Sequence, residues 1–170
     1  MADRPGMMVG DSEHHIQYDM LEVGAKAPDF TLTGTNFRDY SLSDYDGKVK
    51  ILSVLPSIST GVCAAQTRRF NQEAANLSDD IVVLTVSADF PLALKSFCGN
   101  EGIDRTYTVS TYRDMKFADD YGVHDTNYRM CQRSVFVLDK DNVVRYTEYV
   151  PVMGQEVDFD SALDKARELV

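Results

Sequence analysis

The residue best placed for chemistry in this sequence is Cys63, in the stretch PSISTGVCAAQTRRF. Pro56 and Thr60 precede it with the spacing Pro-x-x-x-Thr-x-x-Cys. Thr60 suits the N-cap of a helix, which would place Cys63 in the first turn. Unpaired backbone N–H groups and the positive end of the helix dipole stabilise a thiolate there. Since the thiolate is the nucleophilic form of cysteine, the pattern predicts a reactive site. The alternative is a buried cysteine beside an ordinary N-cap.

The other cysteines restrict the kind of redox chemistry. The chain has three, Cys63, Cys98 and Cys131, and no C-x-x-C sequence. An odd number does not favour a structural disulfide framework. The spacing also argues against a thioredoxin-type motif and against the common zinc sites. Any redox function would therefore use cysteines that are far apart in the sequence.

The composition is that of one soluble globular domain. The chain has 170 residues, of which 44% are hydrophobic and 26% charged, which is enough for a sizeable core. Its net charge of −10 argues against nucleic acid as a partner, because phosphate binding needs a basic surface. No apolar run has the length of a membrane span. The first twenty residues contain no apolar signal region, so we expect a cytoplasmic protein.

The predicted elements alternate along the chain. Val49 to Pro56 is a nearly continuous apolar run, typical of a strand buried on both faces, and the helix of Cys63 follows it. The other predicted elements are a strand at Asp80 to Asp89, a helix from Pro91 that ends at Gly99, a strand at Thr106 to Thr111, a helix at Asp114 to Gly122, a hairpin at Ser134 to Val150 and an amphipathic helix at Asp158 to Val170. This order predicts an α/β fold with a central mixed sheet and helices on both faces.

The N-terminal residues are weakly patterned. We interpret residues 1–22 as an arm, with a short hairpin from about His15 to Glu22, and residues 23–170 as a single domain. His14 and His15 have no companions at metal-ligand spacing. We therefore interpret them as an incidental pair on a mobile arm, and we expect no metal site.

Longer stretches carry a resemblance to a known family. Pro56, Thr60 and Cys63 match the active-site motif of the peroxiredoxins. The stretch LPSISTGVCAAQTRRFNQEAANL is similar to the thiol peroxidase subfamily, as are VSADFPLALKSFCGNEGI, YGV at Tyr121 and RSVFVLDKDNVVRY. The similarity runs from about Val23 to Val170. It implies a thioredoxin-like fold and the reduction of hydrogen peroxide and alkyl hydroperoxides by cysteine alone, without metal, haem or flavin.

The resemblance also implies roles for individual residues. Cys63 would be the peroxidatic cysteine, which becomes a sulfenic acid. Thr60 would hydrogen-bond the peroxide, and Pro56 would shield the pocket from water. Arg133 matches the active-site arginine of the family, and its fixed planar donors would stabilise the thiolate and the peroxide oxygens. Without the resemblance, Arg133 would be interpreted as a surface residue at the start of a strand.

Cys98, in the sequence Phe97-Cys98-Gly99, matches the resolving cysteine of the subfamily. It would attack the sulfenic acid and form an intramolecular disulfide with Cys63. Because disulfide-bonded Cα atoms lie only about 4.4–6.8 Å apart, we expect the first turn at Cys63 to unwind during turnover. Thioredoxin would reduce the disulfide, and the family implies a homodimer packed near the active-site loops. The alternative for Cys98 is a packing residue on a helix face.

Two further alternatives stay open at this point. Cys131 lies outside the family pattern and is either a small packing residue or a thiol that competes with Cys98. The chain is either an enzyme or a peroxide-sensing module that uses a Cys63–Cys98 disulfide as a switch to bind a partner. A third hypothesis, a disulfide exchanger with a thioredoxin fold, is disfavoured because C-x-x-C is absent.

Overall fold

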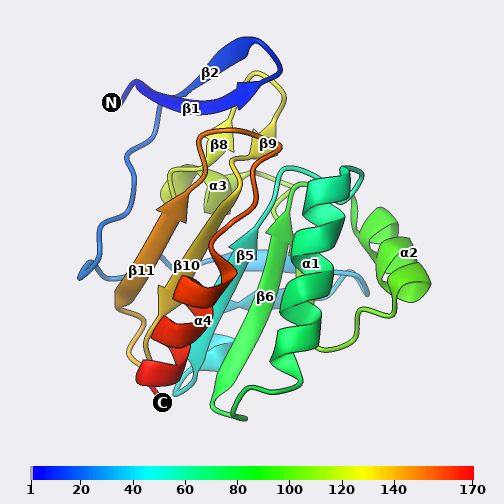
Figure 1. The fold of residues 1–170 in the computed structure, drawn as a ribbon, viewed down its shortest axis with the longest axis vertical. Coiled ribbons are helices and arrows are strands. Elements are labelled where there is room, and N and C mark those ends of the chain that lie inside the picture. The colour runs from blue at the N-terminus through cyan, green and yellow to red at the C-terminus, as the bar shows by residue number, and fades with distance from the viewer. Residues whose placement is uncertain (1) are drawn as a thin grey trace.

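A seven-stranded mixed sheet forms the centre of the computed structural model, which describes residues 2–170 (Figure 1). The strand order is β11-β10-β5-β6-β7-β3-β4. The central strands β5, β6 and β7 are parallel, and the strands on both sides of them run antiparallel. The bounds are β3 Thr31–Gly34, β4 Asp39–Ser41, β5 Val49–Val54, β6 Ile81–Ser87, β7 Tyr107–Ser110, β10 Ser134–Leu138 and β11 Val144–Tyr149. The predicted fold class is confirmed.

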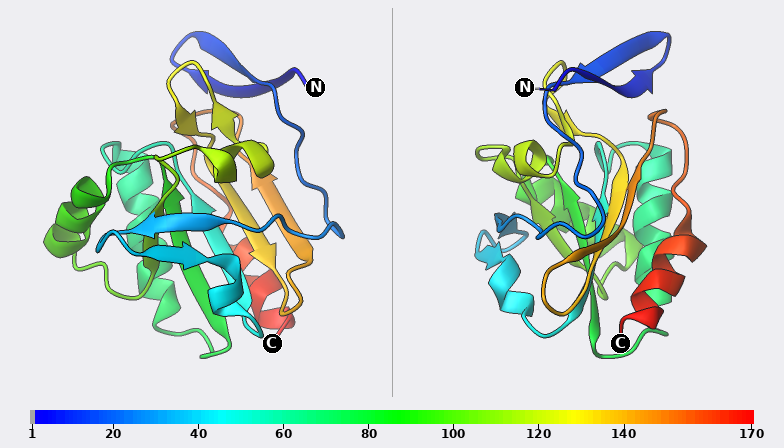
Figure 2. Two further views of the ribbon diagram at one scale, coloured as in Figure 1. Left: turned by 180° about the vertical axis from the view of Figure 1, so that it is seen from behind. Right: turned by 90° about the vertical axis from the view of Figure 1, so that its left-hand side faces the viewer.

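Helices cover both faces of this sheet, as the edge-on view in Figure 2 shows. On one face, α1 (Gly61–Ala74) packs on β5 and β6, and α4 (Phe159–Glu168) packs on β5 and β10. The helix α2 (Pro91–Glu101) packs on β7. The other face is covered by α3 (Lys116–Asp120) and a short 3-10 helix, and it holds a second apolar cluster.

The hydrophobic patterns explain these layers. Strand β5 is buried along its whole length, as expected for a strand with helices on both sides. Ile51 points toward α1 and α4, where it packs in the cluster that contains Phe70. Leu52 belongs to the opposite cluster, with Phe117. Because successive side chains of a strand point to opposite faces of the sheet, β5 contributes to the apolar clusters on both faces.

The end of α2 differs from the prediction. The helix continues through Gly99 to Glu101, and Gly102 provides the left-handed C-cap with φ of 67°. Gly102 donates its N–H to the carbonyl of Cys98. The prediction was wrong because Gly99 and Gly102 are both residues at which a helix commonly ends, and the sequence alone does not tell which of them adopts the left-handed conformation.

The N-terminal hairpin lies earlier in the chain than predicted. Strands β1 (Arg4–Val9) and β2 (Ser12–Ile16) pair antiparallel, so the prediction of His15 to Glu22 was wrong. The hairpin stands beside a small two-stranded sheet, β8 (His124–Asp125) and β9 (Met130–Cys131) (Figure 1). His14 is buried, with its Nδ1 atom 2.5 Å from Asp125 Oδ2. This histidine is therefore not an incidental residue on a mobile arm.

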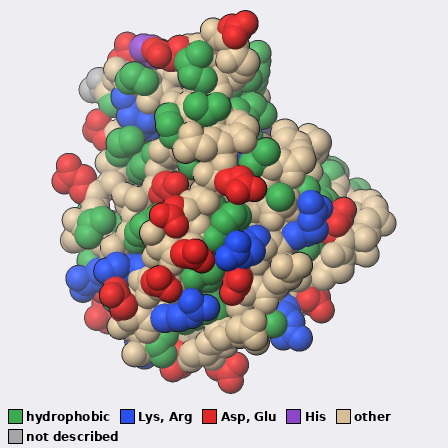
Figure 3. All heavy atoms as spheres, viewed as in Figure 1, with side chains coloured by type: hydrophobic (Ala, Val, Ile, Leu, Met, Phe, Trp, Pro, Cys, Tyr) green, Lys and Arg blue, Asp and Glu red, His purple; other side chains and the backbone are tan. Residues whose placement is uncertain are grey.

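Acidic and basic side chains alternate over the face that carries α1 and α4 (Figure 3). Arg69 of α1 pairs with Glu73 at 3.1 Å and with Asp160 of α4 at 3.4 Å. Such exposed pairs contribute little stability individually, but they join two helices over the same cluster of core residues. Among the helices of residues 2–170, none has the length and the apolar character that a membrane crossing requires.

Candidate active site

Cys63 lies in the first turn of α1, as predicted, and its side chain is completely buried. The helix begins because Thr60 adopts an extended backbone conformation and its hydroxyl accepts a hydrogen bond from the Cys63 N–H at 3.2 Å. This N-cap bond fixes the backbone of Cys63 relative to Thr60. The sulfur therefore lies at the positive end of a 14-residue helix, where a thiolate is stabilised.

The guanidinium of Arg133 contacts this sulfur. Its Nη2 atom lies 3.2 Å from Cys63 Sγ, and Arg133 is also completely buried. Arg133 immediately precedes β10, whose antiparallel pairing with β5 brings it to the start of α1. It is thus not the surface residue that its place at a strand start would suggest. The sulfur therefore accepts a hydrogen bond from a buried donor that carries a permanent positive charge.

Three neighbours hold Arg133, two through its side chain and one through its backbone. The Met153 carbonyl accepts hydrogen bonds from Nε at 3.2 Å and from Nη2 at 2.8 Å. Gln66 Oε1 accepts one from Nη1 at 2.8 Å. The backbone N–H of Arg133 donates to Met7 Sδ at 3.4 Å. The plane of the guanidinium is therefore set by α1 on one side and by the loop before α4 on the other.

Gln66 is a site residue that sequence reasoning missed. It is buried on the face of α1 toward the sheet, and its Nε2 atom donates to Ser53 Oγ at 2.8 Å and to the Val54 carbonyl at 3.4 Å. The sequence shows only a polar residue at helical spacing from Phe70. A glutamine within an apolar helix face, three residues after a candidate nucleophile, is the signal that would have found it.

Pro56 lies just beyond β5 and is buried. It begins the loop that leads to Thr60, and as a proline it fixes the backbone and carries no N–H. The structure thus brings Thr60 and Arg133 each into contact with Cys63, and Pro56 begins the loop that carries Thr60.

Cys98 lies in α2 and does not contact this group. Its side chain is half-buried, and its Sγ donates to Thr108 Oγ1 at 3.4 Å. Burial raises the pKa of the Cys98 thiol, and the hydrogen bond to Thr108 partly offsets that rise. All three cysteines are free thiols.

The sheet shows how Cys63 and Cys98 are placed relative to each other. Ser53, Thr85 and Thr108 lie side by side on neighbouring strands. Gln66 of α1 binds Ser53, and Cys98 of α2 binds Thr108. Both helices thus lie on the same face, and their contact points are two strand spacings apart, about 10 Å. A disulfide between the two cysteines requires a conformational change.

Cys131 is completely buried in β9, within the apolar cluster on the α3 side. Burial, with a smaller contribution from the negative charge of Asp89, raises its pKa to about 12. A thiol with that pKa is not a nucleophile near neutral pH. The geometry therefore favours the packing interpretation.

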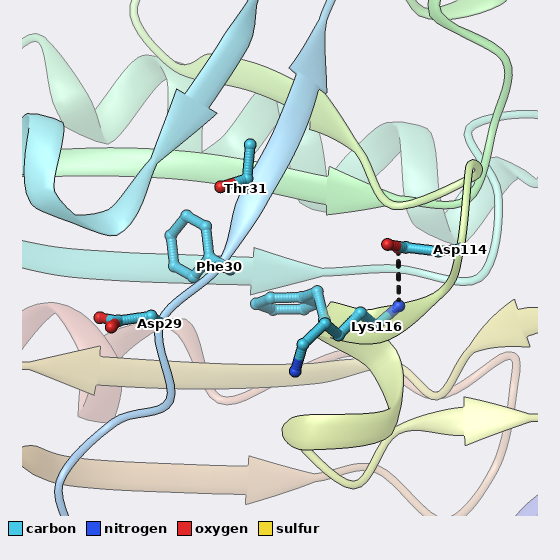
Figure 4. Close-up of a pocket in the computed structure, with 6 residues that line it drawn as sticks. Asp29, Phe30, Thr31, Asp114 and Lys116 are labelled. Carbon is cyan, nitrogen blue, oxygen red and sulfur yellow. Dashed lines mark hydrogen bonds between the residues drawn. The ribbon is translucent and has the colours of Figure 1, made fainter.

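A cavity of about 220 Å³ lies away from Cys63, between the start of β3 with the residues before it and the start of α3, and is lined by Asp29, Phe30, Thr31, Asp114, Lys116 and Phe117. Figure 4 shows that its labelled residues come from these two segments and that the Asp114 side chain accepts a hydrogen bond from the Lys116 backbone. Within residues 2–170, no group of three or more His, Cys, Asp or Glu side chains is arranged to hold a metal ion.

A mixed sheet with a cysteine at the N-terminus of the helix after its central strand defines a thioredoxin-like protein. The family model described as Redoxin matches residues 22–164. A thiol peroxidase from Streptococcus pneumoniae (strain ATCC BAA-255 / R6) is 50% identical over 149 residues, which are 88% of this chain and 91% of the relative. One from Bacillus subtilis (strain 168) is 47% identical over 150 residues, which are 88% and 89% of the two chains.

Solved structures agree on the fold. A peroxiredoxin-like protein from Aquifex aeolicus superposes with a TM-score of 0.91 at 25% identity, covering 100% of both chains. A thiol peroxidase from Chromobacterium violaceum superposes with a TM-score of 0.85 at 23% identity, covering 99% of this chain and 98% of the other. The chain belongs to the Redoxin family and, within it, to the thiol peroxidases.

Proposed function

We propose that this chain is a thiol peroxidase that reduces hydrogen peroxide and alkyl hydroperoxides, with Cys63 as the peroxidatic cysteine. The observation that carries the proposal is the 3.2 Å contact between Arg133 Nη2 and Cys63 Sγ at the start of α1. Membership of the thiol peroxidases supports the reaction class. The contact supports the choice of Cys63 over the other two thiols.

In the first step, the Cys63 thiolate attacks one peroxide oxygen. The S–O bond forms as the O–O bond breaks, and the second oxygen leaves as water or alcohol after it takes a proton. Arg133 stabilises the negative charge that moves onto the leaving oxygen, because its donors are already fixed by Gln66 and Met153. Thr60 holds the turn that carries the sulfur and would hydrogen-bond the peroxide.

In the second step, Cys98 attacks the sulfenic sulfur of Cys63. The S–S bond forms, the S–O bond breaks, and the hydroxyl group leaves as water with the proton of Cys98. An external dithiol then reduces the disulfide by exchange. We propose thioredoxin as that dithiol, on the basis of the resemblance of Cys98 and its surroundings to the family pattern.

The test is peroxide consumption with thioredoxin, thioredoxin reductase and NADPH. Cys63→Ser should abolish turnover, and Cys98→Ser should abolish the thioredoxin-coupled rate while a single oxidation of Cys63 persists. Cys131→Ser should leave the rate nearly unchanged. If the wild type forms the disulfide once but consumes no further peroxide, the peroxidase proposal fails and the sensor hypothesis replaces it.

We also propose a cytoplasmic homodimer. An exposed aromatic cluster supports an interface beside the active-site loop: Phe90 is 50% exposed and contacts Phe37 and Tyr112 edge-on. Phe90 follows Asp89, which hydrogen-bonds the loop before Thr60. Light scattering should report twice the chain mass for the wild type and the mass of a single chain for Phe90→Asp.

A further inference from the structure

Asp89, between β6 and α2, connects the two helices that carry the proposed redox cysteines. This inference rests on the proposed function, in which Cys63 and Cys98 form a disulfide. The helices that carry them contact the sheet, through Gln66 and Cys98, at points two strand spacings apart, so the start of α1, or α2, or both must move first. The interactions that resist this movement therefore control the second step of the cycle.

The carboxylate of Asp89 binds the loop that leads to Cys63. Its Oδ1 accepts a hydrogen bond from Ser57 Oγ at 2.7 Å. Its Oδ2 accepts one from the Ile58 backbone N–H at 3.0 Å and one from Ser87 Oγ at 2.7 Å. The carboxylate is thus held in place by β6, and it holds two consecutive residues of the loop.

From Ser57 the connection continues to the cysteine. The Ser57 carbonyl accepts hydrogen bonds from the Thr60 N–H at 3.2 Å and from the Thr60 hydroxyl at 3.4 Å. The same hydroxyl caps the Cys63 N–H. Four residues therefore form a continuous chain of hydrogen bonds from the end of β6 to the first turn of α1.

Asp89 also holds the start of α2. It precedes Phe90, the N-cap residue, and Pro91, the first residue of the helix. Its carbonyl accepts a hydrogen bond from Ser110 Oγ at 2.5 Å, which joins the start of α2 to the end of β7. One residue thus anchors both the turn of Cys63 and the helix of Cys98 to the sheet.

We propose that Asp89 is a positioning residue that stabilises the fully folded site and slows its opening toward the disulfide. After the first step, the sulfenic acid has two fates. In one, Cys98 attacks it and the disulfide forms with loss of water. In the other, a second peroxide molecule oxidises it to sulfinic acid, again with loss of water. The longer the folded site persists, the larger is the fraction that is over-oxidised.

The experiment compares the wild type with Asp89→Asn and with Asp104→Asn, which makes the same change of charge at an exposed position of the α2–β7 loop. An asparagine replaces one charged acceptor oxygen by an NH2 donor, so the charge-assisted bonds from Ser57 Oγ and the Ile58 N–H are weakened or lost. The fully reduced protein is mixed with graded concentrations of hydrogen peroxide. Mass spectrometry of the intact protein measures the ratio of disulfide to sulfinic acid, and stopped-flow fluorescence measures the rate of disulfide formation.

Asp89→Asn should form the disulfide about tenfold faster and should need about tenfold more peroxide for half over-oxidation, which corresponds to the loss of one charge-assisted hydrogen bond. Asp104→Asn should match the wild type. Ser57→Ala, which removes one donor and leaves the carboxylate in place, should shift the ratio in the same direction by a smaller factor. It also provides the test if Asp89→Asn does not fold.

An unchanged ratio of disulfide to sulfinic acid in folded Asp89→Asn, or in Ser57→Ala if Asp89→Asn does not fold, would overturn the inference. A shift toward sulfinic acid would overturn it as well. Turnover with thioredoxin is measured separately on the wild type. If the wild type forms the disulfide normally but does not turn over peroxide, the proposed function is contradicted. The ratio of disulfide to sulfinic acid then still tests the role of Asp89.

Discussion

At the scale of single residues, the orientation of Arg133 depends on Gln66, a neutral side chain that touches neither peroxide nor sulfur in the proposed reaction. Gln66→Met keeps the volume but removes the acceptor for Arg133 Nη1 and the donor to Ser53. We expect kcat/KM for hydrogen peroxide to fall about 10- to 100-fold, the effect of a misplaced reacting group. The free energy of unfolding should fall by about 1–3 kcal/mol because buried polar atoms lose their partners.

Gln66→Glu is the matched control for this prediction. A glutamate keeps an acceptor for Arg133 Nη1, and it loses the donor to Ser53 and to the Val54 carbonyl and adds a negative charge. Steady-state peroxide consumption should therefore rank the wild type first, Gln66→Glu second and Gln66→Met last. Equal losses in the two variants would mean that Gln66 supports the fold and not the orientation of Arg133.

Cys131 should make the stability of the protein depend on alkaline pH. Burial raises its pKa from 9.0 to about 12. Below pH 9 the thiol is neutral in the folded and in the unfolded protein, and its packing contributes fully to the free energy of unfolding. Between pH 9 and 12 it ionises in the unfolded chain but not in the folded one, so this contribution is lost as the pH rises. The change is at most about 1.4 kcal/mol for each pH unit.

Urea unfolding of the wild type and of Cys131→Ala measures this effect. The difference in free energy of unfolding between the two should be constant from pH 7 to 8.5 and should decrease above pH 9. Tyrosines that ionise at alkaline pH affect both proteins equally, so they cancel in the difference. A difference that stays constant to pH 10.5 would show that Cys131 is accessible to solvent in the native state.

At the scale of elements, the start of α1 serves both the stability of the helix and the site. Thr60→Val removes the hydroxyl that caps the Cys63 N–H and should lower the free energy of unfolding by about 1 kcal/mol. In a chain of this size, that lowers Tm by about 2–4 °C. Thr60→Ser retains the hydroxyl and should keep both Tm and most of the peroxidase activity. Thermal melts and peroxide assays of the two variants distinguish the effect of the capping hydroxyl, which valine lacks, from the effect of the methyl group, which serine lacks.

Strong local patterns made the main elements predictable from the sequence. The apolar run at Val49 and the N-cap at Thr60 gave the central strand and the start of α1 within two residues. The hairpin around Asn142 is likewise confirmed, with φ of 63° at that residue. These features depend on neighbours in the chain, which the sequence displays directly.

Long-range contacts were not predictable in the same way. Gln66, Asp89 and His14 have hydrogen-bond partners 13 to 111 residues away, and nothing in their local sequence identifies those partners. Arg133 was found only through resemblance, because its local sequence is that of an ordinary strand start. The short strands β8 and β9 pair over two residues each, too few for any periodicity to develop.

At the scale of the whole molecule, the N-terminal hairpin supports the site from outside the main sheet. Met8 donates its N–H to the Pro151 carbonyl at 2.8 Å and accepts a hydrogen bond from the Met153 N–H at 3.0 Å. Met153 is the residue whose carbonyl binds Arg133. The hairpin is in turn anchored by the buried pair of His14 and Asp125. The contact between His14 of the hairpin and Asp125 of β8 is therefore linked to the site. The link runs from the hairpin through Met153, in the loop before α4, to the guanidinium beside Cys63.

Two adjacent histidines provide the test of this connection. His14 is 4% exposed and pairs with Asp125 across the fold, whereas His15 is exposed and pairs only with Asp3 and Glu13. His14→Ala leaves the Asp125 carboxylate buried without this partner, so the free energy of unfolding should fall by about 1–3 kcal/mol. The rate of Cys63 oxidation should fall with it, as the Met153 carbonyl loses its support.

His15→Ala should change neither the free energy of unfolding nor the rate of Cys63 oxidation, because its two partners, Asp3 and Glu13, are exposed residues near the N-terminus. Hydrogen exchange gives the decisive measurement. In His14→Ala, protection should decrease in the hairpin and at the amide of Met153, while the central strands β5 and β6 keep theirs. If only the hairpin loses protection and the oxidation rate is unchanged, the hairpin is an appendage whose attachment does not reach the site. If the loop loosens and the rate falls together, the orientation of Arg133 depends on residues at the opposite end of the chain.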